Sequence, residues 1–260
     1  MSSIGVFDSG VGGLTVVKAI QELLPAESIV YIGDTARVPY GNKSKKSIIE
    51  FSIQNVSFLL SKGVKAVVVA CNTASAAALD SLRAKFSIPI IGVIDAGARQ
   101  ALAHTKSRHV GVIGTYRTVK SGAYTEALAA RDLSVTVVQK ACPLFVPVIE
   151  ENFQDHPAAK LIIKEYLADM VGSIDTLILG CTHYPLIKDA IAELYRKITL
   201  VDSATAVAED LAKLLSDRNI VASAGVPQHS YYVTDMSENF LVIAKRILKR
   251  SDIIIEEIAL

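Results

Sequence analysis

The stretch VKAVVVACNT (residues 64–73) and its counterpart SIDTLILGCTH (residues 173–183) each contain an apolar run that ends at a cysteine. A continuous Val/Ile/Leu run of this length, bounded by turn-forming or polar residues, is typical of a parallel strand that is buried on both faces. Cys71 and Cys181 then lie at the carboxyl ends of their strands. Ligands bind at that edge of an open α/β sheet, so both thiols are expected where chemistry takes place.

The same order of elements occurs twice along the chain. Strands are predicted at residues 4–7, 28–32, 66–69 and 88–94, and again at residues 109–113, 134–138, 176–179 and 198–201. When Val110 is aligned with Ile4, the first strands of the two sets are 106 positions apart (110 − 4). The cysteines are 110 positions apart (181 − 71), so the register drifts by only four residues. With predicted helices at 14–24, 44–60 and 73–86, the pattern indicates a duplicated α/β half with mostly parallel sheets.

Two such halves are expected to face each other across a cleft, with Cys71 and Cys181 on opposite walls. The C-terminal part has a predicted helix at 204–215, a strand at 230–234, a helix after Ser237 and an apolar run at 253–255. It is too short to form a third domain. We expect it to pack on the first half, although the pattern alone allows either half.

The composition is that of a globular protein. The chain has 260 residues, 51% of them hydrophobic, which suffices for one large domain or two small ones. The formal net charge is +1 and there is no long basic block, so neither nucleic acid nor an anionic membrane is the expected partner. No export signal is evident and no apolar run approaches the roughly 18 residues of a membrane span, so we expect a cytoplasmic protein.

Three cysteines, an odd number without an export signal, predict free thiols rather than a disulfide framework. Cys142 lies in a predicted loop before a proline and has no counterpart in the first half, so we interpret it as structural. A single cysteine at a strand end is often buried and inert. Two cysteines at equivalent points of a repeat are difficult to explain by packing alone. In addition, each is expected to lie at a helix N-terminus, which lowers the pKa of a thiol toward neutrality.

Two thiols that face each other across a substrate suit the removal of a proton from one face of a carbon and its delivery to the other face. With an unperturbed pKa near about 8.5, one cysteine can act as the base and the other as the acid near neutral pH. The pattern therefore predicts a two-base racemisation, in which the two roles exchange with the direction of reaction.

Three further residues are candidates for proton transfer beside the thiols. Asp8 ends the first strand, at the same sheet edge as Cys71, where it can hydrogen-bond the thiol or take up its proton. His183 follows Cys181 by two residues and has a pKa suited to proton exchange. Glu150 can orient His183 if its loop reaches the cleft. The alternative for Asp8 is a capping role, and for His183 a structural one.

Hydroxyls, an amide and backbone donors gather at the same edge and suit a small zwitterion with two carboxylates. The candidate substrate-binding residues are Asp8, Ser9, Tyr40, Gly41, Asn72, Thr73, Thr118, Thr182 and His183. Each Ser or Thr can instead cap a helix, and the two roles are compatible. No metal site is expected among them.

The glycine-rich loop at residues 10–15 follows a strand and opens a helix, as a dinucleotide-binding loop does. Thr15 stands where that motif requires its third glycine, although Asp34 at the end of the second strand fits the ribose-binding acid. We therefore favour a bare backbone surface that binds a carboxylate through its N–H groups.

Four motifs together resemble those of the bacterial glutamate racemases of the aspartate/glutamate racemase superfamily. They are GVFDSGVGG (5–13), GDTARVPYG (33–41), VACNTAS (69–75) and LGCTHYP (179–185), and the match runs from residue 4 to about residue 210 in the right order. The resemblance implies interconversion of L- and D-glutamate without pyridoxal phosphate or any other cofactor, supplying D-glutamate for peptidoglycan.

The resemblance also implies roles for individual residues. Cys71 and Cys181 would be the paired acid and base, with Asp8 assisting Cys71 and with Glu150 and His183 assisting Cys181. It further implies a first domain of residues 1–95 plus 206–260, a second domain of residues 96–205, and a homodimer.

Three alternatives remain open at this point. An aspartate racemase would carry the same paired thiols, although His183 after Cys181 resembles the glutamate enzymes more closely. Cys71, Cys181 and His183 could be three ligands of a zinc site with an open position. A two-lobed amino-acid-binding protein without enzymatic activity would need neither thiol.

Overall fold

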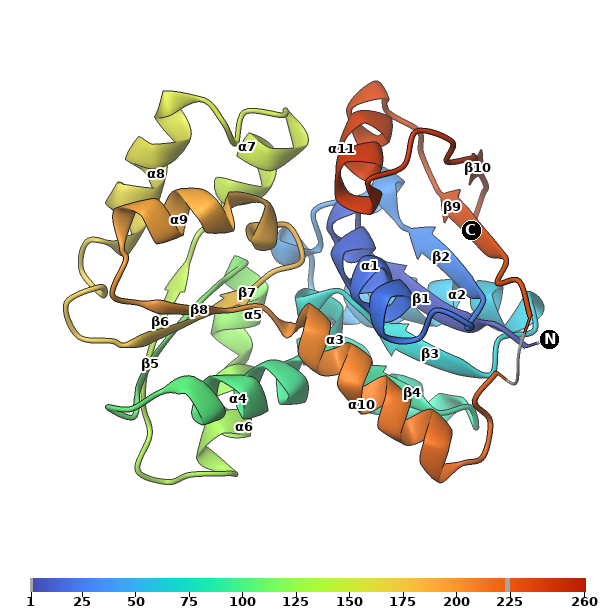
Figure 1. Cartoon of the computed structure of the whole chain (residues 1–260), viewed down its shortest axis with the longest axis horizontal. Coiled ribbons are helices and arrows are strands. Elements are labelled where there is room, and N and C mark those ends of the chain that lie inside the picture. The colour runs from blue at the N-terminus through green and yellow to red at the C-terminus, as the bar shows by residue number, and fades with distance from the viewer. Residues whose placement is uncertain (1, 223–224) are drawn as a thin grey trace.

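The computed structural model describes residues 2–222 and 225–260, and its strands and helices alternate along the chain (Figure 1). The first half contains β1 (Ile4–Asp8), α1 (Leu14–Leu23), β2 (Ile29–Gly33), α2 (Lys45–Ser61), β3 (Ala66–Val69), α3 (Asn72–Lys85), β4 (Ile90–Gly92) and α4 (Val93–His104). The second half contains β5 (His109–Gly114), α5 (Tyr116–Ser121), α6 (Ala123–Ala129), β6 (Thr136–Ala141), α7 (Phe145–Glu150), α8 (Pro157–Leu167), β7 (Thr176–Gly180), α9 (Lys188–Leu194) and β8 (Thr199–Val201). The chain ends with α10 (Ser203–Asp217), β9 (His229–Val233), α11 (Glu238–Leu248) and β10 (Ile255–Glu257). The short 3₁₀ helices are η1 (Val11–Gly13), η2 (Thr35–Arg37), η3 (Tyr40–Asn42) and η4 (Tyr184–Ile187).

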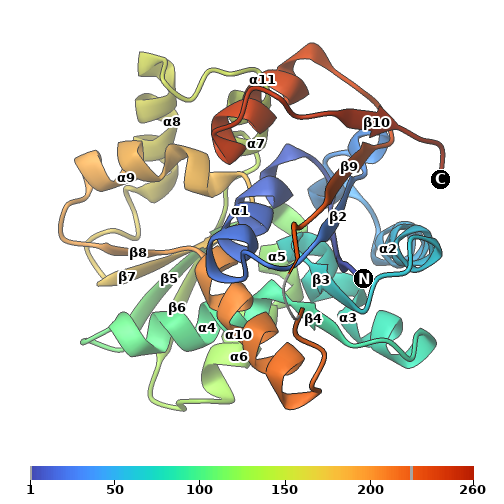
Figure 2. The same cartoon turned by 45° about the vertical axis from the view of Figure 1, so that its right-hand side comes forward.

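The first sheet has six parallel strands in the order β10-β9-β2-β1-β3-β4. Successive side chains of β1 enter opposite cores: Val6 packs with α1, α10 and α11, whereas Phe7 packs with α2 and α3. Helices therefore cover both faces of the sheet, which explains why its central strands are continuously apolar. β9 pairs with β2, so strands from the C-terminal segment extend this sheet (Figures 1 and 2).

The second sheet has four parallel strands in the order β6-β5-β7-β8. Val112 faces the core formed with α4 and α6, and Ile113 faces the core formed with α7, α8 and α9. The order β2-β1-β3-β4 of the first sheet is repeated as β6-β5-β7-β8 in the second. The prediction of two duplicated α/β halves with parallel sheets is confirmed.

The predicted strand at residues 88–94 is wrong in its second half. Only Ile90–Gly92 pair as β4, and Val93, Ile94 and Asp95 already belong to α4. The apolar run continues without interruption because Val93 and Ile94 are buried as helical residues, so hydrophobicity alone does not mark the end of the strand. Gly92 supplies the extended N-cap residue at which the backbone changes direction.

Two helices connect the halves. α4 leads from the first sheet to the second, α10 leads back, and the two pack against each other (Figure 1). The expected domain boundaries at 95/96 and 205/206 fall within these helices. In the described parts of the chain, we find no helix with both the length and the apolar character that a membrane crossing requires.

Candidate active site

A small cavity lies between the carboxyl ends of the two sheets and is lined from both halves of the chain. Its volume is about 10 Å³, which leaves room for about one water molecule. The lining residues are Ser9, Val38, Pro39, Tyr40, Gly41, Cys71, Asn72 and Thr73 from the first half and Thr115, Val146, Cys181, Thr182 and His183 from the second. The two cysteines that end equivalent strands thus meet at one cavity.

Cys71 is the N-cap residue of α3. Its sulfur accepts a hydrogen bond from the Ala74 N–H at 3.4 Å and donates one to Oγ of Ser9 at 3.7 Å. Burial, followed by the charge of Asp8, raises the pKa of Cys71 to about 12, against the lowering effect of the Ala74 N–H. The expected depression of this pKa is therefore wrong for the closed cavity, because desolvation of a buried thiolate outweighs the helix N-terminus.

Asp8 lies behind the cavity lining and is fully buried. Its Oδ2 accepts hydrogen bonds from the N–H groups of Gly10 (3.1 Å) and Gly13 (2.9 Å), and its Oδ1 accepts one from Oγ1 of Thr182 (3.1 Å). Burial raises the pKa of Asp8, whereas nearby His183 and these hydrogen bonds oppose the rise. The carboxylate thus joins the glycine-rich loop to the second half, while Cys71 donates to Ser9.

The second thiol has a different set of partners. Sγ of Cys181 lies 3.8 Å from Nδ1 of His183, and Nε2 of His183 lies 2.9 Å from Oε1 of Glu150. Burial alone lowers the pKa of His183, but its contacts with Cys181 and Glu150 outweigh burial and raise this pKa well above its usual value. The imidazole therefore holds a proton next to the sulfur, and the two thiols are not chemically equivalent.

Tyr40 and Gly41 are the first two residues of η3, and both line the cavity. Pro39, which directly precedes η3, lines it as well. The hydroxyl of Tyr40 donates to the buried carboxylate of Asp34. Asp34 also accepts hydrogen bonds from Nε of Arg37 at 2.8 Å and from Oγ1 of Thr234 at 3.0 Å. Thr234 directly follows β9, so the C-terminal segment supports this wall of the cavity.

Hydrogen bonds between the halves surround Asn72 and Thr73. Oγ1 of Thr73 lies 2.9 Å from that of Thr115 and 3.2 Å from that of Thr118. The hydroxyl of Tyr124 donates to Oδ1 of Asn72 at 2.6 Å. Thr118 is itself fully buried behind Thr115, so among the predicted binding residues Asp8 and Thr118 support the lining instead of forming it.

Sequence reasoning missed four lining residues. Thr115 was detectable, because it stands 106 positions after Ser9 (115 − 9), the same offset that relates the first strands of the halves. Val38, Pro39 and Val146 are apolar residues in loops or short helices, and no periodic pattern distinguishes them from core residues.

The zinc alternative has no structural support. Within residues 2–222 and 225–260, no group of three or more His, Cys, Asp or Glu side chains is arranged to hold a metal ion. Cys71, Cys181 and His183 therefore do not form the site that was considered above.

Comparison with known proteins identifies the family. The family model described as Asp/Glu/Hydantoin racemase matches residues 4–211. The chain is 48% identical to the glutamate racemase of Persephonella marina over 99% of this chain and 97% of that protein. It belongs to the Asp/Glu/hydantoin racemase family.

Solved structures of family members agree with the fold. Glutamate racemase RacE1 of Bacillus anthracis superposes with a TM-score of 0.95 at 42% identity, covering 100% of this chain and 98% of that one. The Francisella tularensis glutamate racemase, solved in complex with D-glutamate, superposes with a TM-score of 0.92 at 39% identity and covers 100% and 97%. An aspartate racemase of Picrophilus torridus, at 23% identity and a TM-score of 0.61, shares the fold alone. The predicted racemase family is confirmed.

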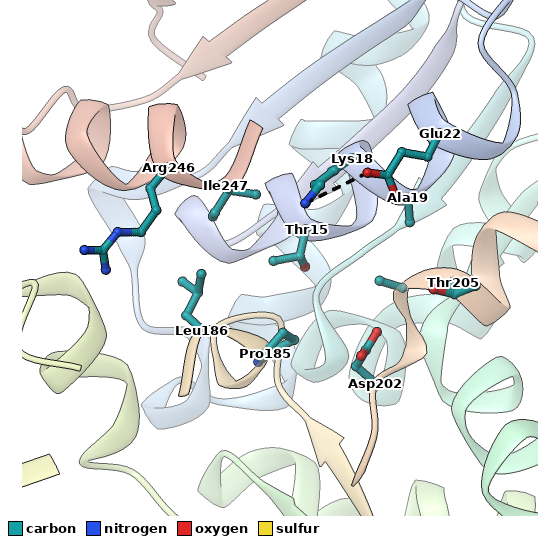
Figure 3. A pocket seen from close by; sticks show the side chains of 11 residues that line it. Thr15, Lys18, Ala19, Glu22, Pro185, Leu186, Asp202, Thr205, Arg246 and Ile247 are labelled. Atoms are coloured by element: carbon teal, nitrogen blue, oxygen red, sulfur yellow. Dashed lines mark ion pairs between the residues drawn. The ribbon is translucent and has the colours of Figure 1, made fainter. Parts of the chain in front are cut away.

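A second and larger cavity, of about 300 Å³, lies between the halves of this Asp/Glu/hydantoin racemase family member (Figure 3). It is bounded by α1, α11, η4 and the start of α10. Its charged residues are paired within the protein: Lys18 with Glu22 (3.9 Å), Asp202 with Lys188 (2.7 Å) and Arg246 with Asp155 (3.1 Å). The charged side chains that line this cavity are therefore neutralised by ion pairs within the protein.

The buried thiols predict a loss of stability at alkaline pH. Burial raises the pKa of Cys142 to about 12, as it does for Cys71. Because these values exceed the unfolded value of about 8.5, the stabilisation is complete below that pH and is lost as pH rises toward 12. Each thiol then contributes a slope of about −1.4 kcal/mol per pH unit to the free energy of unfolding.

We expect Cys142→Ser to make this slope shallower by about 1 kcal/mol per pH unit between pH 9 and 10. Urea unfolding of the wild-type chain and the variant at several pH values measures it. The slope is compared, not the stability at one pH, so a general cost of the substitution does not affect the result. Equal slopes for the two proteins would contradict the buried, neutral state of Cys142.

Proposed function

We propose that the chain interconverts L- and D-glutamate without a cofactor, by a two-base proton transfer at Cα, and thereby supplies D-glutamate for peptidoglycan synthesis. The observation that carries this proposal is the pair of thiols, Cys71 and Cys181, which line one cavity from equivalent strand ends of the two halves. Relatives named glutamate racemase that align with nearly the whole chain support glutamate as the substrate.

In the proposed reaction, a thiolate takes the Cα proton, the C–H bond breaks, and the electron pair remains on Cα next to the α-carboxylate. The opposite thiol then delivers its proton to the other face. Burial raises the pKa of Cys71 to about 12, so it holds its proton. The His183 imidazole, whose pKa is raised, lies beside Sγ of Cys181 and Oε1 of Glu150, where its positive charge can stabilise a thiolate at Cys181. Cys181 is thus the proposed base in the closed state, and Cys71 is the proposed acid.

The lining offers donors for two carboxylates. The candidates are the hydroxyls of Ser9, Thr73 and Thr115, the amide of Asn72 and the backbone at Gly41. Tyr40 and Thr182 also line the cavity, but their hydroxyls already donate to Asp34 and Asp8. Thr118 and Asp8 would support these groups from behind, through Thr73 and Thr182 respectively. Apolar Val38 and Val146 complete the wall and help to exclude water from the carbanion.

Glutamate requires the cavity to open. A volume of about 10 Å³ accepts a water molecule but not an amino acid, so we infer that the halves separate to admit the substrate and then close on it. We propose that the moving units are residues 1–95 plus 206–260 and residues 96–205, with α4 and α10 as the connections.

Incubation with L-glutamate and, separately, with D-glutamate in D₂O without added cofactor tests this function. Optical rotation should decay to zero from either enantiomer, and the product should carry deuterium at Cα. Aspartate enantiomers in parallel reactions separate the glutamate assignment from an aspartate racemase. Binding of glutamate without exchange at Cα would instead favour an amino-acid-binding protein and overturn the proposal.

A further inference from the structure

Tyr124 connects the two halves at the active site. It belongs to α6 of the second half and is fully buried, yet its hydroxyl donates a 2.6 Å hydrogen bond to Oδ1 of Asn72 in the first half. Asn72 directly follows Cys71, opens α3 and lines the cavity. The tyrosine therefore contacts the residue next to a proposed catalytic thiol without lining the cavity itself.

The position of Tyr124 is fixed by both connections between the halves. Ser203, the first residue of α10, lies close enough to Tyr124 to oppose the rise in the tyrosine pKa that burial causes. On α4, a Cβ added to Gly97 would lie 3.1 Å from the Tyr124 hydroxyl and 3.3 Å from Cβ of Ser203. Gly97 thus leaves space for the ring where α4 and α10 lie side by side (Figures 1 and 2).

The contact between Tyr124 and Asn72 sets the direction of their hydrogen bond. A hydroxyl has one proton to donate, and an amide oxygen can only accept. Tyr124 therefore donates its proton to Oδ1 of Asn72. With Oδ1 turned toward Tyr124, the amide of Asn72 directs its NH₂ group away from the tyrosine.

We propose that Tyr124 is a positioning residue, which holds Oδ1 of Asn72 so that the amide presents N–H donors to a substrate carboxylate in the cavity. This inference rests on the proposed function, since it requires an anionic amino acid as the ligand. Without the tyrosine hydroxyl, the amide can turn over and place its oxygen against the carboxylate, where two acceptors repel each other. Tyr124 would thus act on substrate affinity and not on the proton transfers at Cys71 and Cys181.

Tyr124→Phe removes this hydroxyl and keeps the buried ring. We expect KM for L- and D-glutamate to rise about 10-fold while kcat changes less than about 3-fold, because a lost hydrogen bond to a charged ligand has about this effect. Tyr231→Phe is the matched control: Tyr231 is also a buried tyrosine, its hydroxyl is bonded at 3.1 Å to Nε2 of Gln21, and it does not line the cavity. Its KM should equal that of the wild-type chain.

A double-mutant cycle with Asn72→Ala distinguishes positioning from a general structural role. In the Asn72→Ala background, Tyr124→Phe should leave KM unchanged, since no amide remains to be oriented. An equal rise in KM in both backgrounds, or a wild-type KM for Tyr124→Phe, would overturn the inference. If Tyr124→Phe does not fold, Gly97→Ala tests the same contact, because its Cβ would lie 3.1 Å from the Tyr124 hydroxyl and displace it. A smaller rise in KM, of about 3-fold, is then expected only when Asn72 is present.

Failure of the proposed function gives a different result. A wild-type chain that does not racemise glutamate would overturn the proposed function, and with it this inference. An active wild-type chain with an unaffected Tyr124→Phe variant would overturn only the role of Tyr124.

Discussion

Cys71→Ser and Cys181→Ser are each expected to lower kcat for glutamate racemisation by about 10²–10⁴-fold, the usual contribution of a positioned acid or base. A serine hydroxyl is a much weaker acid and its alkoxide is inaccessible near neutral pH, so it can neither remove the Cα proton nor return one efficiently. Serine is close to cysteine in volume, so it fits these two buried positions and folding should be retained. Racemisation is followed by optical rotation from each enantiomer.

Isotope exchange separates the two half-reactions. In each single variant the remaining thiol still faces one side of Cα, so it can remove a proton there and return a deuteron to the same face. We expect slow α-deuteration of one enantiomer by Cys71→Ser and of the opposite enantiomer by Cys181→Ser, both without inversion. Cys142→Ser, a buried cysteine outside the cavity, should retain wild-type kcat. If either cavity variant kept more than about a tenth of kcat, the two-base mechanism would be wrong.

Gly12→Ala is expected to prevent closure of the cavity. A Cβ at Gly12 would lie 2.6 Å from Oγ1 of Thr182 and 2.7 Å from the backbone N of His183. Both atoms belong to the other half, and the backbone of His183 cannot move without shifting its contacts with Cys181 and Glu150. We expect kcat/KM to fall at least about 10²-fold, because a displacement of about 1 Å at a catalytic group has this effect.

The stability of the Gly12→Ala variant should change little, since the contact joins two halves that each have their own cores. Gly172→Ala is the control for a glycine replacement, because an added Cβ there meets no atom within 4 Å. Mass spectrometry after brief alkylation provides a second readout: Cys71 is 4% exposed in the closed state and should react faster when closure is blocked. Nearly normal activity with unchanged alkylation would show that the halves approach less closely than in this structure.

The duplicated fold could be predicted because its evidence is local and repeated. Runs of branched apolar residues mark central strands, and the nearly constant offset between the halves places Cys71 and Cys181 at equivalent strand ends. The end of β4 could not be located, since Val93 and Ile94 are as apolar in α4 as they would be in a strand. Periodicity identifies burial but does not tell which element buries the residue.

The details of the site depend on how the halves approach each other, and the sequence contains no direct signal for this. Tyr124 lies 52 positions after Asn72 in a different half, and nothing in its neighbourhood marks it as a partner of the cavity. The thiol pKa of Cys71 was mispredicted for a related reason: the helix N-terminus is a local feature, whereas burial results from the whole assembly of loops. Proximity of Glu150 to His183, in contrast, was correctly anticipated.

The pairing of β9 with β2 has a consequence for biosynthesis. The last residue of β2, Gly33, and the first residue of β9, His229, are 196 positions apart (229 − 33). A ribosome adds about 5–20 residues per second, so β9 is synthesised roughly 10–40 s after β2. During this time its outer edge offers unpaired N–H and C=O groups to any other nascent strand. Asp34, directly after β2, also lacks the hydroxyl of Thr234 until the segment after β9 has been synthesised. The exposed edge of β2 should therefore make the nascent chain depend on chaperones until β9 pairs with it.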